Sequence, residues 1–120
     1  MKSDIRTDNL TLTPAIEQYL ATRIKSIAKL IDPNDESARG EVLLAKISDH
    51  HLHGLIFQAE INLHIAGWYG RAEASGSDLY MVINEMKEEI IRQLRSHKKK
   101  QKTLSNKEGR KVKDWLRNWF

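Results

Sequence analysis

The sequence contains no cysteine, only two prolines, and no apolar run long enough to cross a bilayer. The absence of cysteine excludes a disulfide framework and a thiolate metal site. The opening residues, MKSDIRTDNL, lack the apolar core of a signal peptide. A chain of 120 residues has the usual size of one compact domain with one hydrophobic core. We therefore expect a soluble, cytoplasmic protein.

Motifs of catalysis are also missing. The chain has no GxSxG turn, no P-loop and no cysteine nucleophile, and its carboxylates are scattered. A histidine group, His50, His51 and His53 with His64 further along, is the nearest approach to a metal site. Structural zinc needs a full set of convergent ligands, and adjacent histidines in extended backbone point apart. We expect a solvated turn here, no cofactor and no enzymatic activity. A small metal-dependent enzyme is the alternative, which stoichiometric zinc in the purified protein would favour.

Positive charge is concentrated at one end of the chain. Residues 95–120 contain ten lysines or arginines and two acids, whereas residues 1–94 contain ten bases and fourteen acids. The overall charge of +4 therefore conceals a basic end on an acidic body. Such asymmetry favours a polyanionic partner, either nucleic acid or an anionic membrane. The alternative is a solvated tail that serves solubility alone.

The first third of the sequence predicts a strand followed by a helix. Residues 4–12 read as a weak strand. Thr13 before Pro14 is a helix-start signal, because a hydroxyl cap precedes proline at the first helical position. Apolar residues then recur at helical spacing until the sequence DPND, residues 32–35, ends the helix. This stripe comprises Ile16, Leu20, Ile24, Ile27 and Ile31.

Three further strands are predicted in the middle of the chain. Residues 41–48 are apolar enough for one strand. In residues 55–65 every odd position is apolar, whereas positions 58, 60, 62 and 64 are polar, so one face is buried and one is wet. Ala66 and Gly67 begin a tight turn into residues 68–75, whose inner positions include small residues that leave room for a helix.

A second helix and a basic extension complete the order. Ser77 is the expected cap of the second helix. Residues 103–109 read as a linker, and the apolar spacing of residues 112–120 predicts a short amphipathic helix. We therefore divide the chain into a domain at residues 1–102 and a basic, tryptophan-rich extension at residues 103–120. The expected class is α+β in the order β-α-β-β-β-α, with a four-stranded, antiparallel-rich sheet and two helices on one face. The second apolar stripe comprises Leu79, Ile83, Met86, Ile90 and Leu94.

Two motifs carry a resemblance to a known family. With TPAIEQYLATRI opening the first helix and GSDLYMVINEMKEEIIRQL the second, the chain resembles the ribosome hibernation-promoting factors, a family that includes the ribosome-associated translation inhibitors. The family's second helix has a D-x-Y-x-x-I-(D/N) start and an R-Q-L-x-x-H-K-x-K finish, which residues 78–84 and 92–100 match. The resemblance covers residues 4–101. This sequence departs from the family pattern at Glu89, where the family often has lysine.

The resemblance implies a fold and a function. Family members are not enzymes; they bind the small (30S) ribosomal subunit in the cleft where messenger and transfer RNAs pass. There they block translation and keep ribosomes inactive and intact during stress or stationary phase. Their fold is similar to a double-stranded-RNA-binding domain, and basic side chains of its two helices face 16S-type ribosomal RNA. This chain would be a short form without the dimerisation domain of longer members. A module that binds free double-stranded RNA is the alternative.

The expected RNA contacts are cations of the two helices. A cluster fixed on a packed helix loses less ordering entropy on binding phosphates than a floppy tail does. For Lys98–Lys100 the alternative is that they only complement the negative C-terminal end of their own helix. The predicted RNA-binding residues are Arg23, Lys25, Lys29, Lys87, Arg92, Arg95, Lys98, Lys99, Lys100 and Lys102.

The tryptophan-rich extension admits three interpretations. Trp115 and Trp119 could stack on RNA bases. The helix could instead fold back on the body or pair with a second copy. Its cations could also place it on an anionic membrane. We favour contact with the ribosome or self-association through Trp115 and Trp119, and expect neither membrane binding nor a small-molecule substrate.

Overall fold

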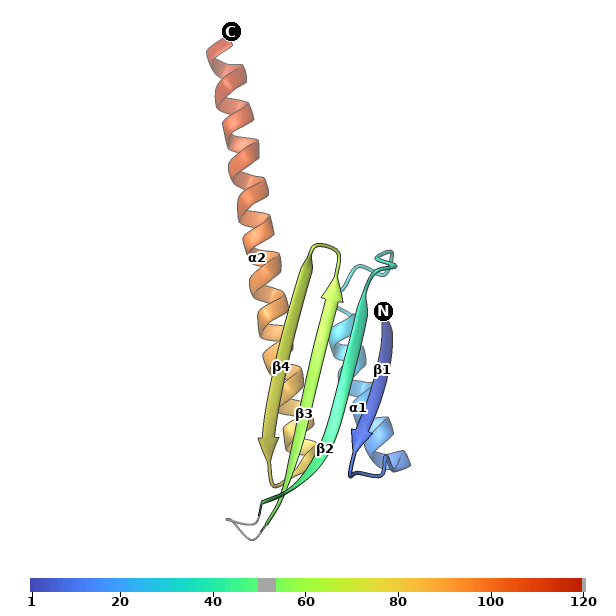
Figure 1. The fold of residues 1–120 in the computed structure, drawn as a ribbon. Helices are drawn as coiled ribbons and strands as arrows, with labels where there is room; N and C mark the ends of the chain where they lie inside the picture. The colour runs from blue at the N-terminus through green and yellow to red at the C-terminus, as the bar shows by residue number, and fades with distance from the viewer. Residues whose placement is uncertain (50–53, 120) are drawn as a thin grey trace.

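In the computed structural model, two helices cover one face of a four-stranded sheet (Figure 1). The structure describes the backbone of residues 1–49 and 54–119 and the side chains of residues 1–47 and 54–102. The predicted α+β class and element order are confirmed. The elements are β1 (Lys2–Asp8), α1 (Pro14–Ala28), β2 (Arg39–Asp49), β3 (Gly54–Ile65), β4 (Trp68–Gly76) and α2 (Leu79–Trp119).

The strands follow one another across the sheet in chain order, β1-β2-β3-β4. β1 pairs with β2 in parallel, whereas the pairs β2–β3 and β3–β4 are antiparallel. A parallel pair needs a crossover connection, which α1 supplies. The tight turn between β3 and β4 uses Gly67 at a φ of 73°, a left-handed conformation that glycine adopts without steric cost. The result is a mixed sheet with three antiparallel strands.

β1 is shorter than the predicted strand at residues 4–12. It ends at Asp8, and all seven of its residues are exposed. Asn9 follows with a φ of 53°, which takes the chain out of the extended conformation. Leu10 and Leu12 therefore lie beyond the strand, half-buried against the core. The apolar residues that suggested a longer strand anchor the loop into α1.

α1 begins as predicted. Thr13 adopts an extended conformation, and its hydroxyl accepts a hydrogen bond from the Ile16 N–H at 3.3 Å, while Pro14 occupies the first helical position. The helix ends at Ala28, so Ile31, predicted as its last apolar residue, lies in the turn that follows. Ile31 is nevertheless buried.

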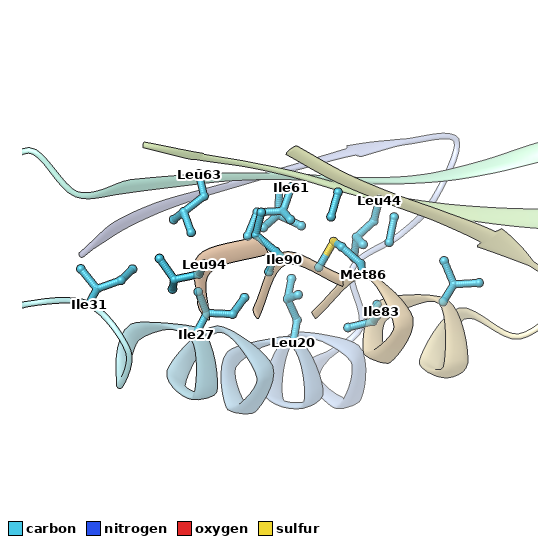
Figure 2. Packing of buried hydrophobic residues seen from close by; sticks show 14 of the residues in the cluster. Leu20, Ile27, Ile31, Leu44, Ile61, Leu63, Ile83, Met86, Ile90 and Leu94 are labelled. Atoms are coloured by element: carbon cyan, nitrogen blue, oxygen red, sulfur yellow. The ribbon is translucent and has the colours of Figure 1, made fainter. Parts of the chain in front are cut away.

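A single apolar core fills the space between the sheet and the two helices (Figure 2). α2 packs over β3 and β4 and alongside α1. Complete burial of a leucine or isoleucine side chain contributes about 1.5–3 kcal/mol. The largest fully buried side chains are Leu20 and Ile27 of α1, Leu44, Ile61 and Leu63 of the sheet, and Val82, Ile83, Met86, Ile90 and Leu94 of α2.

The cap of α2 is Asp78 rather than the predicted Ser77. The Asp78 carboxylate accepts a hydrogen bond from the Tyr80 N–H at 3.0 Å, and its carbonyl accepts one from the Val82 N–H at 3.0 Å. A carboxylate at this position also complements the positive end of the helix dipole, which a serine hydroxyl does not. The charge of Asp78 therefore explains the shift by one residue.

α2 continues without interruption to Trp119, well beyond the end of the sheet (Figure 1). The prediction of a linker at residues 103–109 was wrong, and the predicted short amphipathic helix is the last part of α2. Residues 103–109 contain no proline, and Gly109 alone costs about 1 kcal/mol in a helix interior. The linker-like composition is therefore compatible with helix.

Trp68 fixes α2 at the level where it leaves the sheet. The indole ring stacks on the imidazole of His97, with ring centroids 5.2 Å apart and planes 20° apart. The same indole lies across Gly70, where a Cβ atom would fall inside van der Waals contact with three indole carbons. Gly70 therefore provides the space that the indole occupies.

Asp35 ties the loop after α1 to the turn between β3 and β4. Its carboxylate accepts hydrogen bonds from the Ser37 hydroxyl, from the Ala66 N–H at 2.9 Å and from the Ser37 N–H at 3.0 Å. The Ser37 hydroxyl first, and then the Ala66 N–H, hold the pKa of Asp35 below its ordinary value of 3.8. Both donors favour the ionised carboxylate.

Gly70→Ala should destabilise the fold by about 1–3 kcal/mol, the usual cost of overpacking, because the new methyl group displaces the indole. Urea unfolding measures the free energy. In a Trp68→Leu background the same substitution should cost much less, because the ring that it displaces is gone. An equal cost in both backgrounds would show that the indole is not the cause.

Asp35→Asn should remove a pH-dependent contribution to stability. A carboxyl with a lowered folded-state pKa stabilises the fold fully above its unfolded value of 3.8, and this contribution disappears as the pH falls through the folded-state pKa. The difference in unfolding free energy between wild type and variant should therefore be constant near neutral pH and shrink in acid. Urea titrations from about pH 2 to pH 7 measure it. A difference independent of pH would contradict the role of the ionised carboxylate.

Candidate nucleic-acid interface

The two helices run parallel, and side chains join them at three levels. The contacts advance in the same direction along both helices, so the C-terminal halves of α1 and α2 lie at the same end of the sheet. The pairs, in order, are Tyr19 with Tyr80, with ring centroids 5.0 Å apart, Arg23 Nε with Asn84 Oδ1 at 3.2 Å, and the Leu30 carbonyl with the Lys98 ammonium.

This parallel packing gathers most of the predicted cations at one end of the helical layer. Lys25 lies in the last turn of α1 and Lys29 caps its C-terminal end, and the others belong to α2 where it passes the end of the sheet. All of them are exposed. We name this group the cation cluster; it comprises Lys25, Lys29, Arg95, Lys98, Lys99, Lys100 and Lys102.

Lys98 also has a structural contact. Its ammonium group donates a hydrogen bond to the Leu30 carbonyl, just beyond the C-terminal end of α1. A cation at this place complements the negative end of the α1 dipole. The alternative to RNA contact was that Lys98 complements its own helix, whereas the contact in the structure is at the end of the neighbouring helix. The contact fixes Lys98 between the two helices, and an ammonium group retains further donors for a ligand.

Three predicted cations lie outside the cluster. Arg23 is half-buried midway along α1, and its guanidinium carbon lies 4.2 Å from the centre of the Tyr19 ring. Lys87 is half-buried in the preceding part of α2. Arg92 is paired with Glu89. Spacing along the sequence grouped these residues with the others, but their burial and pairing set them apart.

Glu88 and Glu89 precede the cation cluster on α2 and accept hydrogen bonds from neighbouring side chains. Glu88 accepts a hydrogen bond from the Asn84 amide at 3.3 Å. Glu89 pairs with Arg92 and accepts a second hydrogen bond from the Gln93 amide at 3.1 Å. Gln93 in turn donates to the Arg71 carbonyl on β4 at 2.8 Å, so Glu89 lies toward the β4 flank of α2. Residues 79–91 of α2 therefore carry three acids and one lysine, whereas residues 92–102 carry six cations and no acid.

A hollow of about 350 Å³ lies beside the cluster at the end of the sheet. Lys29 and Lys98 line it together with His97 and Asp35. The Asp35 carboxylate is already engaged by Ser37 and Ala66. Asp32 also lines the hollow, and its carboxylate accepts a hydrogen bond from the Asn34 N–H at 2.9 Å. The hollow therefore presents two cations beside two carboxylates that have local donors.

No metal site or membrane-spanning helix is found in the part of the chain that the structure describes. Among the side chains of residues 1–47 and 54–102, no three His, Asp or Glu groups converge as a metal would require, and none of the described helices is long and apolar enough to cross a membrane. His50, His51 and His53 lie outside the described residues. The same holds for the side chains of Trp115 and Trp119, so self-association stays a prediction.

The partners of Arg23 were not predicted from the sequence. Arg23 is held by Tyr19 and Thr22 of its own helix and by Asn84 of α2. A signal was present, because Tyr19 precedes Arg23 by four positions and Tyr80 precedes Asn84 by four. Two residues four apart share a helix face, so matching pairs on two helices indicate facing surfaces.

Comparison with known proteins finds relatives by sequence and solved structures with a similar fold. The ribosome hibernation promoting factor of Acinetobacter guillouiae is 33% identical over 108 residues, covering 84% of this chain and 90% of the relative. The protein of the same name from Klebsiella oxytoca is 26% identical over 102 residues, covering 85% and 98%. These sequences confirm the resemblance found from the helix motifs.

Solved structures share the fold. The N-terminal domain of Thermus thermophilus Protein Y superimposes with a TM-score of 0.65 at 21% identity, covering 81% of this chain and 99% of that domain. A ribosomal subunit interface protein of Coxiella burnetii gives a TM-score of 0.64 at 17% identity, covering 82% and 98%. The model of one protein family matches residues 4–102. The chain therefore belongs to the Sigma 54 modulation protein / S30EA ribosomal protein family.

Proposed function

We propose that this chain is a ribosome hibernation factor. It binds the small ribosomal subunit in the cleft where messenger and transfer RNAs pass, and it inhibits translation during stress or stationary phase. The names of its relatives from Acinetobacter guillouiae and Klebsiella oxytoca support this function. The observation that carries the proposal is the collection of seven exposed cations, from the C-terminal end of α1 and from α2, at one end of the helical layer.

In this mechanism the protein acts by occupying the cleft of the small subunit and not by catalysing a reaction. The apolar core holds both helices on the sheet, so the cations approach ribosomal RNA as a rigid group and lose little entropy on binding. Neutralising RNA phosphates releases their counterions, which supplies affinity. The bound protein then fills space that messenger and transfer RNAs need. No covalent bond is made or broken in this action.

Salt dependence follows from this mechanism. If about six phosphates are contacted, affinity for the small subunit should fall by about a thousandfold between 50 and 200 mM salt. Sedimentation with purified small subunits through sucrose gradients measures binding at each salt concentration. A wild-type protein that stays at the top of the gradient at low salt would refute the proposal.

Replacing Lys29 and Arg95 by alanine should weaken binding to small subunits and reduce its salt dependence. Each phosphate contact contributes about 0.9 to the slope of log K against log salt, or about tenfold in affinity near 0.1 M salt. The double variant should therefore bind about a hundredfold more weakly, with a slope smaller by about 2. Lys98 is left intact because it contacts α1.

The matched control removes the same charge from the opposite face of the sheet, as Arg6→Ala with Arg39→Ala. Both arginines are exposed on the face of the sheet that the helices do not cover. This control should bind nearly as the wild type does. Equal losses in the two double variants would show that net charge, and not the helical surface, determines binding.

A competition experiment tests the alternative of a general duplex-binding module. A model RNA duplex that binds the protein as tightly as small subunits do would favour that alternative.

A further inference from the structure

A cleft of about 710 Å³ lies at the other end of the helical layer, beside the first turns of α1 and α2. Leu10, Ile16 and Phe57 form apolar parts of its wall, and Tyr80 stands at its side. Lys46 is the cation that lines it. Clefts with an apolar wall and a few polar groups are typical of sites for small organic groups.

The ring of Tyr80 is held in place by Tyr19, which itself packs against Arg23. Its ring meets the Tyr19 ring edge to face, at 5.0 Å between centroids and 84° between planes. The Arg23 guanidinium lies 4.2 Å from the centre of the Tyr19 ring, and Asn84 and Thr22 accept its hydrogen bonds at 3.2 and 3.1 Å. Tyr80 is nevertheless 42% exposed. An aromatic ring that is fixed and exposed can stack on a planar ligand at little entropic cost.

The charges around the cleft favour a nucleotide over other planar groups. Lys46 stands opposite Phe57 in the register of β2 and β3, so a cation adjoins the apolar wall. Asp78 also lines the cleft, but its carboxylate already accepts the Tyr80 N–H. A planar base fits between aromatic and aliphatic side chains, and its phosphate fits an ammonium group.

The acids that follow the cleft on α2 favour contact with a nucleobase of the RNA over contact with its phosphates. Glu85, Glu88 and Glu89 follow within three turns of the cleft and disfavour a phosphate backbone along this part of the helix. Stacking on an aromatic ring is less sensitive to these charges. Tyr80 and Lys98 are 18 residues apart, or about 27 Å along α2, so one folded RNA can span the cleft and the cation cluster.

We propose that this cleft binds an unpaired nucleobase of the target RNA, with Tyr80 as the stacking surface and Lys46 beside the adjoining phosphate. The proposal rests on the proposed function, because it assigns a second contact to the same RNA-binding layer. The cation cluster grips the backbone, and the cleft fixes the position of the protein along the RNA.

Tyr80→Ala should weaken binding to purified small subunits by about 5- to 150-fold, the usual range for loss of one base–aromatic stack. The salt slope should not change, because no phosphate contact is lost. Tyr80→Phe retains the ring and should bind within about twofold of wild type. The matched control is Met81→Ala, since Met81 is 60% exposed on the same helical turn and does not line the cleft.

A short single-stranded RNA carrying 2-aminopurine reports on stacking directly. Its fluorescence should be quenched by the wild type and by Tyr80→Phe, and much less by Tyr80→Ala. Lys46→Ala leaves the Tyr80–Tyr19 contact intact and should lower the salt slope for small subunits by about 1. Lys46→Ala still tests whether the cleft binds RNA if melting curves show that Tyr80→Ala is unfolded.

Three results separate the inference from the proposed function. If Tyr80→Ala binds small subunits as tightly as Met81→Ala does, the cleft is not a base site. If Lys46→Ala binds with the slope and affinity of the wild type, no phosphate lies beside the cleft, and the inference is again overturned. Failure of the wild type itself to bind small subunits would overturn the proposed function.

Discussion

The structure depends on one apolar interface, in which two parallel helices share a core against the same face of the sheet. Leu20 and Ile27 of α1 meet Ile90 and Leu94 of α2 in this core, and all four side chains are fully buried (Figure 2). Because the helices are parallel, their C-terminal halves lie together. The cations of those halves therefore form one group, although the chain separates them by more than sixty residues.

The same interface also separates the charges of the helical layer. Three acids lie in residues 79–91 of α2, where Glu88 and Glu89 engage neighbouring side chains, and cations alone follow in residues 92–102. Lys98 has two roles, since it complements the end of α1 while belonging to the cation cluster. The charged part of the helical layer therefore has a defined direction, which a uniformly basic tail does not offer.

Period and capping signals were sufficient to predict the element order, because the stripes of α1 and α2 and the alternation in β3 are strong. The errors in the predicted element bounds have local causes. Asn9, with its positive φ, ends β1 early, and the charge of Asp78 moves the cap of α2 by one residue. The predicted linker is helical because no proline interrupts α2. Contacts between elements, such as Lys98 with Leu30, could not be predicted from one sequence because they depend on the relative placement of two helices. The pairing of Arg92 with Glu89 could have been expected from their spacing of three.

Chemical acetylation of lysines, with the protein alone and bound to small ribosomal subunits, tests most directly whether the helical layer faces the ribosome. The account predicts that the subunit protects Lys25, Lys29 and Lys100, which are exposed in the cation cluster. Lys2 lies on the exposed edge strand β1 and should react equally in both states. Protection of Lys2 with unchanged reactivity of the helical lysines would contradict the account.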